Sequence, residues 1–207
     1  MTTPASEAAG EGHFAAVKWL VDHGANINEE GLHGTALHGT AAAGNFEMVK
    51  YLVEKGADVD KTEVTSASKG DQLSLVRYLI ESGVDAQCTN LRGRNALQEA
   101  SAAGAIVVTD FLLSHGVDLQ QADKFGATPV LEASRHGRLE NLRRLLKAGG
   151  SVSDVNIAGQ TALHLAAQGG HKEICRLILE YDADVDYRDK RRCTVLPPVV
   201  MLKSWSC

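Results

Sequence analysis

Two stretches of the chain decide its fold. Residues 35–60 read TALHGTAAAGNFEMVKYLVEKGADVD, and residues 161–186 read TALHLAAQGGHKEICRLILEYDADVD. They align position for position without a gap, although they lie far apart in the chain. An internal repeat of this length is typical of an array of small stacked units rather than a single globular core.

Glycines mark the period along the whole chain. One series lies in the middle of each copy, at Gly12, Gly44, Gly70, Gly104, Gly137 and Gly170. A second series closes each copy, at Gly24, Gly56, Gly83, Gly116 and Gly149, with Asp182 in the last position. A glycine that follows a helix commonly adopts the left-handed conformation that ends it. We therefore expect two helices in each copy.

Each unit has the chemistry of a helix pair. Thr35 and Thr161 are suited to cap the first helix, and the alanines that follow allow a neighbouring helix to pack closely. The second helix carries apolar residues at helical spacing, as at Met48, Val49 and Leu52. No unit can bury this apolar face alone, so the stability of the array comes from stacking.

This pattern resembles the ankyrin repeat, whose signature is D-x-x-G-x-T-P-L-H-x-A-A-x-x-G-H, an apolar helix and G-A-D-V-N. The resemblance extends over about residues 3–190 and implies an all-α solenoid of stacked helix pairs with short β-hairpin fingers. We assign residues 1–194 to the repeat domain and 195–207 to an irregular tail. The repeats fall at about 3–28, 29–60, 61–88, 89–121, 122–154 and 155–187, with a partial copy at 188–194.

The third copy departs from the pattern. Measured from Gly44 to Gly70 it is seven residues short, and the missing residues are those of its finger. We expect an intact second helix at about residues 73–82, a shortened first helix and a gap in the row of fingers. The sequence favours a tolerated loop deletion over a functional notch.

No catalytic or metal-binding motif appears in the sequence. The four cysteines form no C-x-x-C pair, and we expect reduced thiols at Cys88, Cys175, Cys193 and Cys207. The resemblance gives His38 and His164 a structural role, and His23 and His115 are placed to cap helix ends. The prediction is a protein that is not an enzyme and that has no cofactor, metal or small-molecule substrate.

Charge is distributed unevenly along the chain. Residues 1–88 hold 13 acidic and 6 basic residues, whereas residues 89–207 hold 13 acidic and 15 basic residues. No apolar run is long enough to cross a membrane, and no secretory signal opens the chain. We expect a monomer in the cytoplasm, with the nucleus as the alternative because of the basic run at 188–192.

In the ankyrin family, partners generally contact the fingertips and the exposed face of each first helix. The resemblance therefore implies a protein-binding surface, and the basic tips of the second half suggest an acidic partner segment. The expected function is that of an adaptor, scaffold or inhibitor. The alternatives are a substrate-recruiting fragment of a larger protein and a nucleic-acid binder working through basic fingertips. The expected contact residues are Leu32, Leu91, Arg92, Arg94, Lys124, Phe125, Arg135, His136, Ile157 and Gln160.

Overall fold

The structure is a computed structural model that describes residues 2–31, 34–59 and 61–189. Within these ranges the chain forms twelve α-helices and no strand longer than an isolated bridge. The helices are α1 (Pro4–Gly10), α2 (Phe14–Asp22), α3 (Ala36–Ala43), α4 (Phe46–Glu54), α5 (Lys61–Lys69), α6 (Leu73–Glu81), α7 (Ala96–Ala103), α8 (Ile106–Ser114), α9 (Pro129–Arg135), α10 (Leu139–Lys147), α11 (Ala162–Gln168) and α12 (Lys172–Leu179).

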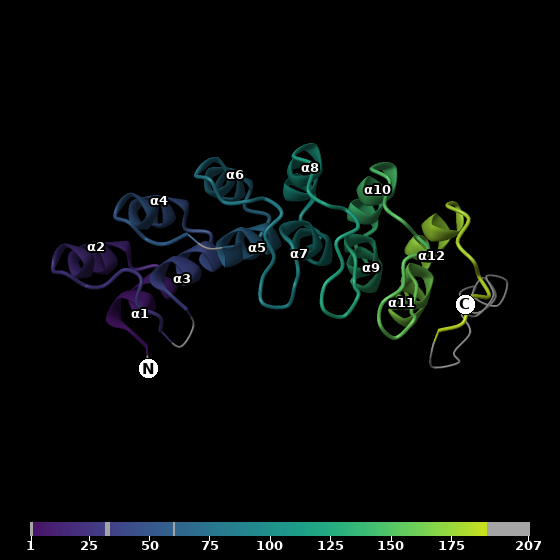
Figure 1. Ribbon diagram of the computed structural model, residues 1–207, viewed down its shortest axis with the longest axis horizontal. Helices are drawn as coiled ribbons and strands as arrows, with labels where there is room; N and C mark the ends of the chain where they lie inside the picture. Colours follow the sequence, from purple (N-terminus) through teal and green to yellow (C-terminus); the bar gives the residue numbers. More distant parts are fainter. Residues whose placement is uncertain (1, 32–33, 60, 190–207) are drawn as a thin grey trace.

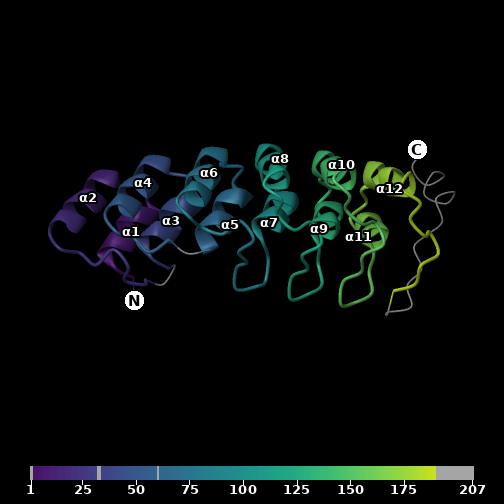
Figure 2. The same cartoon turned by 45° about the horizontal axis from the view of Figure 1, so that its top comes forward.

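The helices form two rows in a curved, elongated array (Figure 1). The odd-numbered helices form the inner row, in which each helix from α1 to α11 contacts the next. The even-numbered helices form the outer row and pack on the inner helix of their own repeat. Long loops leave the inner row on one side, below α7, α9 and α11 in both views (Figures 1 and 2). The fold is therefore the all-α solenoid that the sequence predicts.

The caps of α1, α3, α7 and α11 agree with the expectation from the sequence, whereas Thr128 before α9 makes no capping hydrogen bond. Thr35 Oγ1 and Asn95 Oδ1 each accept a hydrogen bond from the backbone N–H three residues later. Thr161 does the same, and Thr3 caps α1 with Pro4 in its first turn. These caps satisfy backbone donors that the first turn of a helix leaves unpaired.

The ends of the helices correct one position. Gly44 and Gly104 have φ of +74° and +86° at the C-caps of α3 and α7, as predicted. In the third copy the left-handed residue is Asp71, with φ of +55°, and not Gly70. The series Gly12, Gly44, Asp71, Gly104 then advances in the same intervals as Gly24, Gly56, Gly83, Gly116, so the third copy is six rather than seven residues short.

The third copy also differs from its predicted helices. The second helix, α6, is intact as expected. The first helix, α5, is not shortened: it spans nine residues and is longer than the seven- or eight-residue first helices of the other repeats. Without a finger, the chain enters the helix soon after Gly56 and can begin it at Lys61. The gap in the fingers is therefore present, but the helix behind it is complete.

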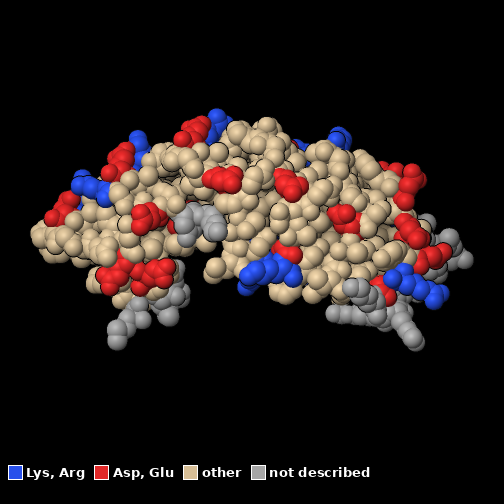
Figure 3. Space-filling model, viewed as in Figure 1, with Lys and Arg blue, Asp and Glu red and all other residues tan. Residues whose placement is uncertain are grey.

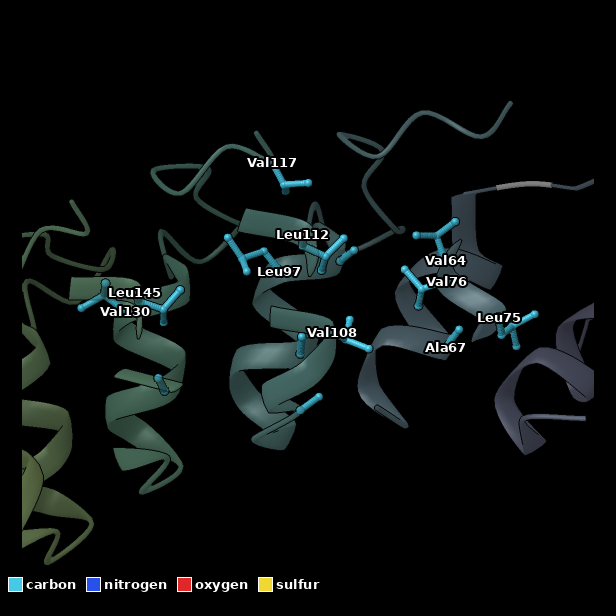
Figure 4. Close-up of a cluster of buried hydrophobic side chains, with 14 of the residues drawn as sticks. Val64, Ala67, Leu75, Val76, Leu97, Val108, Leu112, Val117, Val130 and Leu145 are labelled. Atoms are coloured by element: carbon cyan, nitrogen blue, oxygen red, sulfur yellow. The ribbon is translucent and has the colours of Figure 1, made fainter. Parts of the chain in front are cut away.

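One apolar cluster runs through the stack from Ala9 to Ile178. Leu97 of α7 and Leu112 of α8 are completely buried, and the neighbouring repeats contribute Val76 and Leu145. Figure 4 shows these side chains at successive helix pairs of the stack. Full burial of a large aliphatic side chain contributes about 1.5–3 kcal/mol. The solenoid is thus held together by interfaces between repeats, as in a one-dimensional stack.

Candidate protein-binding surface

The fingers before α7, α9 and α11 share one tip geometry. Asn90 Oδ1 accepts hydrogen bonds from the backbone N–H groups of Arg92 and Arg94, at 2.9 and 3.2 Å. Asp123 and Asn156 bind the equivalent N–H groups of their own fingers. A short side chain that replaces backbone acceptors in this way holds a turn in one conformation. The three tips are therefore built alike.

Neighbouring tips are also joined through their backbones. The Lys124 N–H donates to the Arg92 carbonyl at 3.1 Å, and the Ile157 N–H donates to the Phe125 carbonyl at 3.0 Å. Gly126, with φ of +71°, lies so close to the next finger that an added Cβ would approach the Ile157 nitrogen to 3.0 Å. The fingers therefore form a connected row rather than three independent loops.

Large apolar side chains are exposed on this row. Leu91, Phe125 and Ile157 are 87%, 57% and 62% exposed, and they come from three consecutive fingers. Isolated exposed apolar side chains are ordinary, but a series of them on one edge is typical of a binding surface. The fingers lie side by side in both ribbon views, so their tips lie along one side of the array (Figures 1 and 2).

Two hollows adjoin the fingers. One, of about 610 Å³, lies beside the Leu91 finger and extends to Thr62 and Lys69 of α5. The other, of about 510 Å³, is lined by the Leu91, Phe125 and Ile157 fingers and by α9. Both are lined by Arg92, Arg94 and His136, and these two adjoining hollows are together called the groove below.

An ion-pair cluster lies at the floor of this groove. The Glu132 side chain is only 7% exposed, and its Oε2 accepts a hydrogen bond from Arg94 Nη2 at 2.6 Å. Arg135 and His136 also face Glu132, at 3.6 and 3.5 Å, and Arg94 Nε lies 3.4 Å from Glu99. Three residues expected to contact a partner thus converge on one carboxylate. Arg135 and His136 lie three and four residues after Glu132, whereas Arg94 comes from the preceding repeat, a contact that the sequence did not reveal. The signal that could have pointed to Glu132 is its helical spacing of three and four residues from Arg135 and His136.

The remaining expected residues differ in their surroundings. Arg92 and Lys124 are exposed, and in the described ranges neither has a carboxylate partner. Gln160 is half-buried, and its Oε1 accepts from Asn156 Nδ2 at 3.1 Å. Leu32 lies outside the described residues. Figure 3 shows a basic patch below α7, separated by a recess from acidic side chains on the N-terminal repeats.

The histidines and the cysteine considered next make structural contacts or are buried. His23 and His115 each place Nδ1 on the carbonyl four residues earlier, at 2.7 and 2.8 Å, which confirms their role at helix ends. His38 lies against Thr35 and Thr62. Cys175 is buried, and burial raises the pKa of its thiol. Among the described residues, no group of three potential metal ligands is found.

Comparison with known proteins assigns every repeat to one family. A family model of three ankyrin repeats matches residues 1–63 and again 64–157, and a single ankyrin repeat matches residues 158–190. Among the curated proteins, none matches this chain. In the part of the chain described here, no helix has the length and hydropathy to cross a membrane.

Proposed function

The chain belongs to the ankyrin repeat family, and on that premise we propose that it is a non-enzymatic binding module that holds a partner protein on its fingers and inner helices. Ankyrin repeats are generally protein–protein interaction modules, and the family is typically non-enzymatic. The proposal for this chain concerns the surface and the chemistry of the partner.

The observation that carries the proposal is the connected row of exposed apolar tips. Leu91, Phe125 and Ile157 are held on fingers that their backbones link, so little conformational freedom is lost when a partner covers them. An interface centre tends to combine apolar anchors with arginine. Here Arg92 lies next to Leu91 and lines both halves of the groove.

Charge supports a partner with an acidic segment. The protein as a whole carries a net charge of −5, yet Arg92 and Lys124 stand exposed on the fingertips without a carboxylate partner in the described ranges. Opposite charge on a partner would raise the association rate and favour one orientation of binding. The proposed contact residues are therefore Leu91, Arg92, Lys124, Phe125 and Ile157. Arg94 has a different role, because its ion pair with Glu132 holds the finger against α9.

The test is a double substitution on the fingertips. Affinity capture from a native cell extract, followed by mass spectrometry, identifies the partner, and calorimetry with the purified pair measures the affinity. Phe125→Ala with Arg92→Ala is expected to weaken binding by at least a hundred-fold, about 3 kcal/mol. Helical content and melting temperature should not change, because both side chains are exposed.

The matched control lies on the outer row. Val107→Ala with Lys147→Ala also removes one exposed apolar and one exposed basic side chain, but from α8 and α10, and should leave affinity unchanged. Undiminished binding by the fingertip variant would refute the proposed surface. Salt-sensitive binding of RNA or DNA to the wild-type chain, lost in the same variant, would replace it with a nucleic-acid function.

A further inference from the structure

The gap left by the absent third finger has an unused backbone donor at its edge. Within the connected row, each finger donates one N–H to the finger before it: Lys124 to Arg92, and Ile157 to Phe125. The residue of the first finger that corresponds to Lys124 and Ile157 is Leu91, which like them lies two positions before the finger glycine. The Leu91 N–H has no acceptor among the described residues.

The missing acceptor belongs to the missing finger. If the third copy had the same length as the fourth, its fingertip carbonyl would stand where the Arg92 carbonyl stands for Lys124. Instead α5 begins at Lys61, and the first hollow of the groove, of about 610 Å³, extends from Leu91 to Thr62 and Lys69. Figure 3 shows the molecular edge recessed on this side of the basic patch.

The cations of the groove indicate what could occupy it. Lys69, Arg92 and Arg138 are exposed, and none has a carboxylate partner in the described part of the chain. Arg138 Nε donates to the Ala102 carbonyl at 2.9 Å, which fixes this side chain against α7. In contrast, Arg94 is already paired with Glu99 and Glu132. Three unpaired cations around one groove favour an occupant with carboxylates.

We propose that the partner supplies the third finger: an extended acidic segment of a protein enters the gap, accepts a hydrogen bond from the Leu91 N–H on a backbone carbonyl, and places carboxylates near Lys69, Arg92 and Arg138. This mode of binding adds a backbone to an open edge, and the edge donor selects for an extended conformation. The proposal rests on the proposed function, since it names the segment that the same surface binds.

The probe is a capped peptide of alternating Glu and Val, which is acidic and favours an extended backbone. Titrated into the isotope-labelled chain and followed by nuclear magnetic resonance, it should shift the Leu91 amide signal in a saturable way and slow its hydrogen exchange. The same peptide with Lys in place of Glu should leave the Leu91 amide unchanged. No saturable change at Leu91, or equal changes with both peptides, overturns the proposal.

Two substitutions at one position isolate the backbone donor. Leu91 follows Asn90 in a turn closed by the hydrogen bond from the Gly93 N–H to the Asn90 carbonyl at 2.8 Å. Proline is favoured at that position of a turn and has no N–H. Leu91→Ala removes the side chain alone, so Leu91→Pro should bind the acidic peptide roughly five-fold more weakly than Leu91→Ala, as expected for one net hydrogen bond. Equal affinities overturn the inference.

A restored finger provides the second test. Replacing Asp60 with a copy of residues 120–126 adds six residues and gives the third copy the length of its neighbours. This finger should protect the Leu91 amide in the free chain and abolish peptide binding; continued binding overturns the inference. Binding of the natural partner by these variants distinguishes this inference from the proposed function. If the Phe125→Ala and Arg92→Ala variant loses it but the restored-finger chain retains it, the proposed function stands and the gap is not its site.

Discussion

At the scale of single residues, the same backbone conformation is reached by different side chains for different reasons. Asp71 and Asp182 both adopt positive φ, at +55° and +57°, where the other copies have glycine. Asp71 has a compensating contact, because its Oδ1 accepts a hydrogen bond from the Val108 N–H at 3.1 Å and so caps α8 of the next repeat. Asp182 is exposed and has no such side-chain bond in the described structure.

This contrast predicts that substitution by glycine stabilises the protein at position 182 but not at position 71. Asp182→Gly should raise the free energy of unfolding by about 0.5–1 kcal/mol, because glycine adopts positive φ without steric cost. Asp71→Gly should give no gain, since it removes the cap of α8 together with the strain. Urea unfolding followed by circular dichroism measures both. A stabilised Asp71→Gly chain would show that the bond to Val108 contributes less than the relief of strain.

At the scale of elements, the finger before α7 is fastened to α9 through one arginine. Arg94 reaches Glu132 across the repeat boundary, and Gln98 Nε2 donates to the Ala127 carbonyl at 2.5 Å alongside it. Arg92 is two positions away on the same finger but is exposed and lines the groove. Of the two arginines of this finger, Arg94 thus joins two repeats, and Arg92 is the one that we propose to contact a partner.

Alanine substitutions should separate these roles. Arg94→Ala leaves the buried Glu132 carboxylate without its closest cation and should lower the free energy of unfolding by about 2–4 kcal/mol. Arg92→Ala should change it by less than about 0.5 kcal/mol, as expected for an exposed residue. Chemical denaturation of the two variants beside the wild type is the measurement. Equal stabilities of the two variants would contradict the structural role of Arg94.

At the scale of the whole molecule, stability is a property of neighbouring repeats. The core cluster is continuous, but each inner helix makes its main contacts with the outer helix of its own repeat and with the inner helices before and after it. In such an array the effect of a lost contact should spread along the stack and weaken with distance. The middle of the array is therefore the most sensitive place for a core substitution.

Leu97 of α7 tests this behaviour. Leu97→Ala should cost about 2–5 kcal/mol and accelerate amide exchange in the repeats on both sides of α7. Val17→Ala, in α2 at one end of the array, should accelerate exchange only in α1 to α4. Hydrogen exchange read by mass spectrometry compares the two variants. Uniform acceleration along the whole chain after Val17→Ala would indicate a single cooperative unit instead.

The sequence by itself determined the repeat, the two helices of each copy and their caps. These features depend on short-range chemistry: Thr35 binds its own first turn, and Gly44 adopts positive φ wherever the helix lies. It also predicted the gap in the fingers, because a deletion is visible in the spacing. The expected contact residues followed only from the resemblance to the ankyrin family, and they remain a prediction.

Only the tertiary structure decided which of those residues are engaged with one another. Arg94 reaches Glu132 from the preceding repeat, and the Leu91 N–H is left without an acceptor because the finger that would supply one is absent. Arg135 and His136 contact Glu132 from three and four residues further along the chain, a spacing that is visible in the sequence. Two predictions from the sequence were wrong for a similar reason: the first helix of the third copy was expected to be short, and Gly70 rather than Asp71 was expected to be left-handed. A helix can extend, and an aspartate can replace glycine, when packing and contacts from the next repeat compensate for local preference.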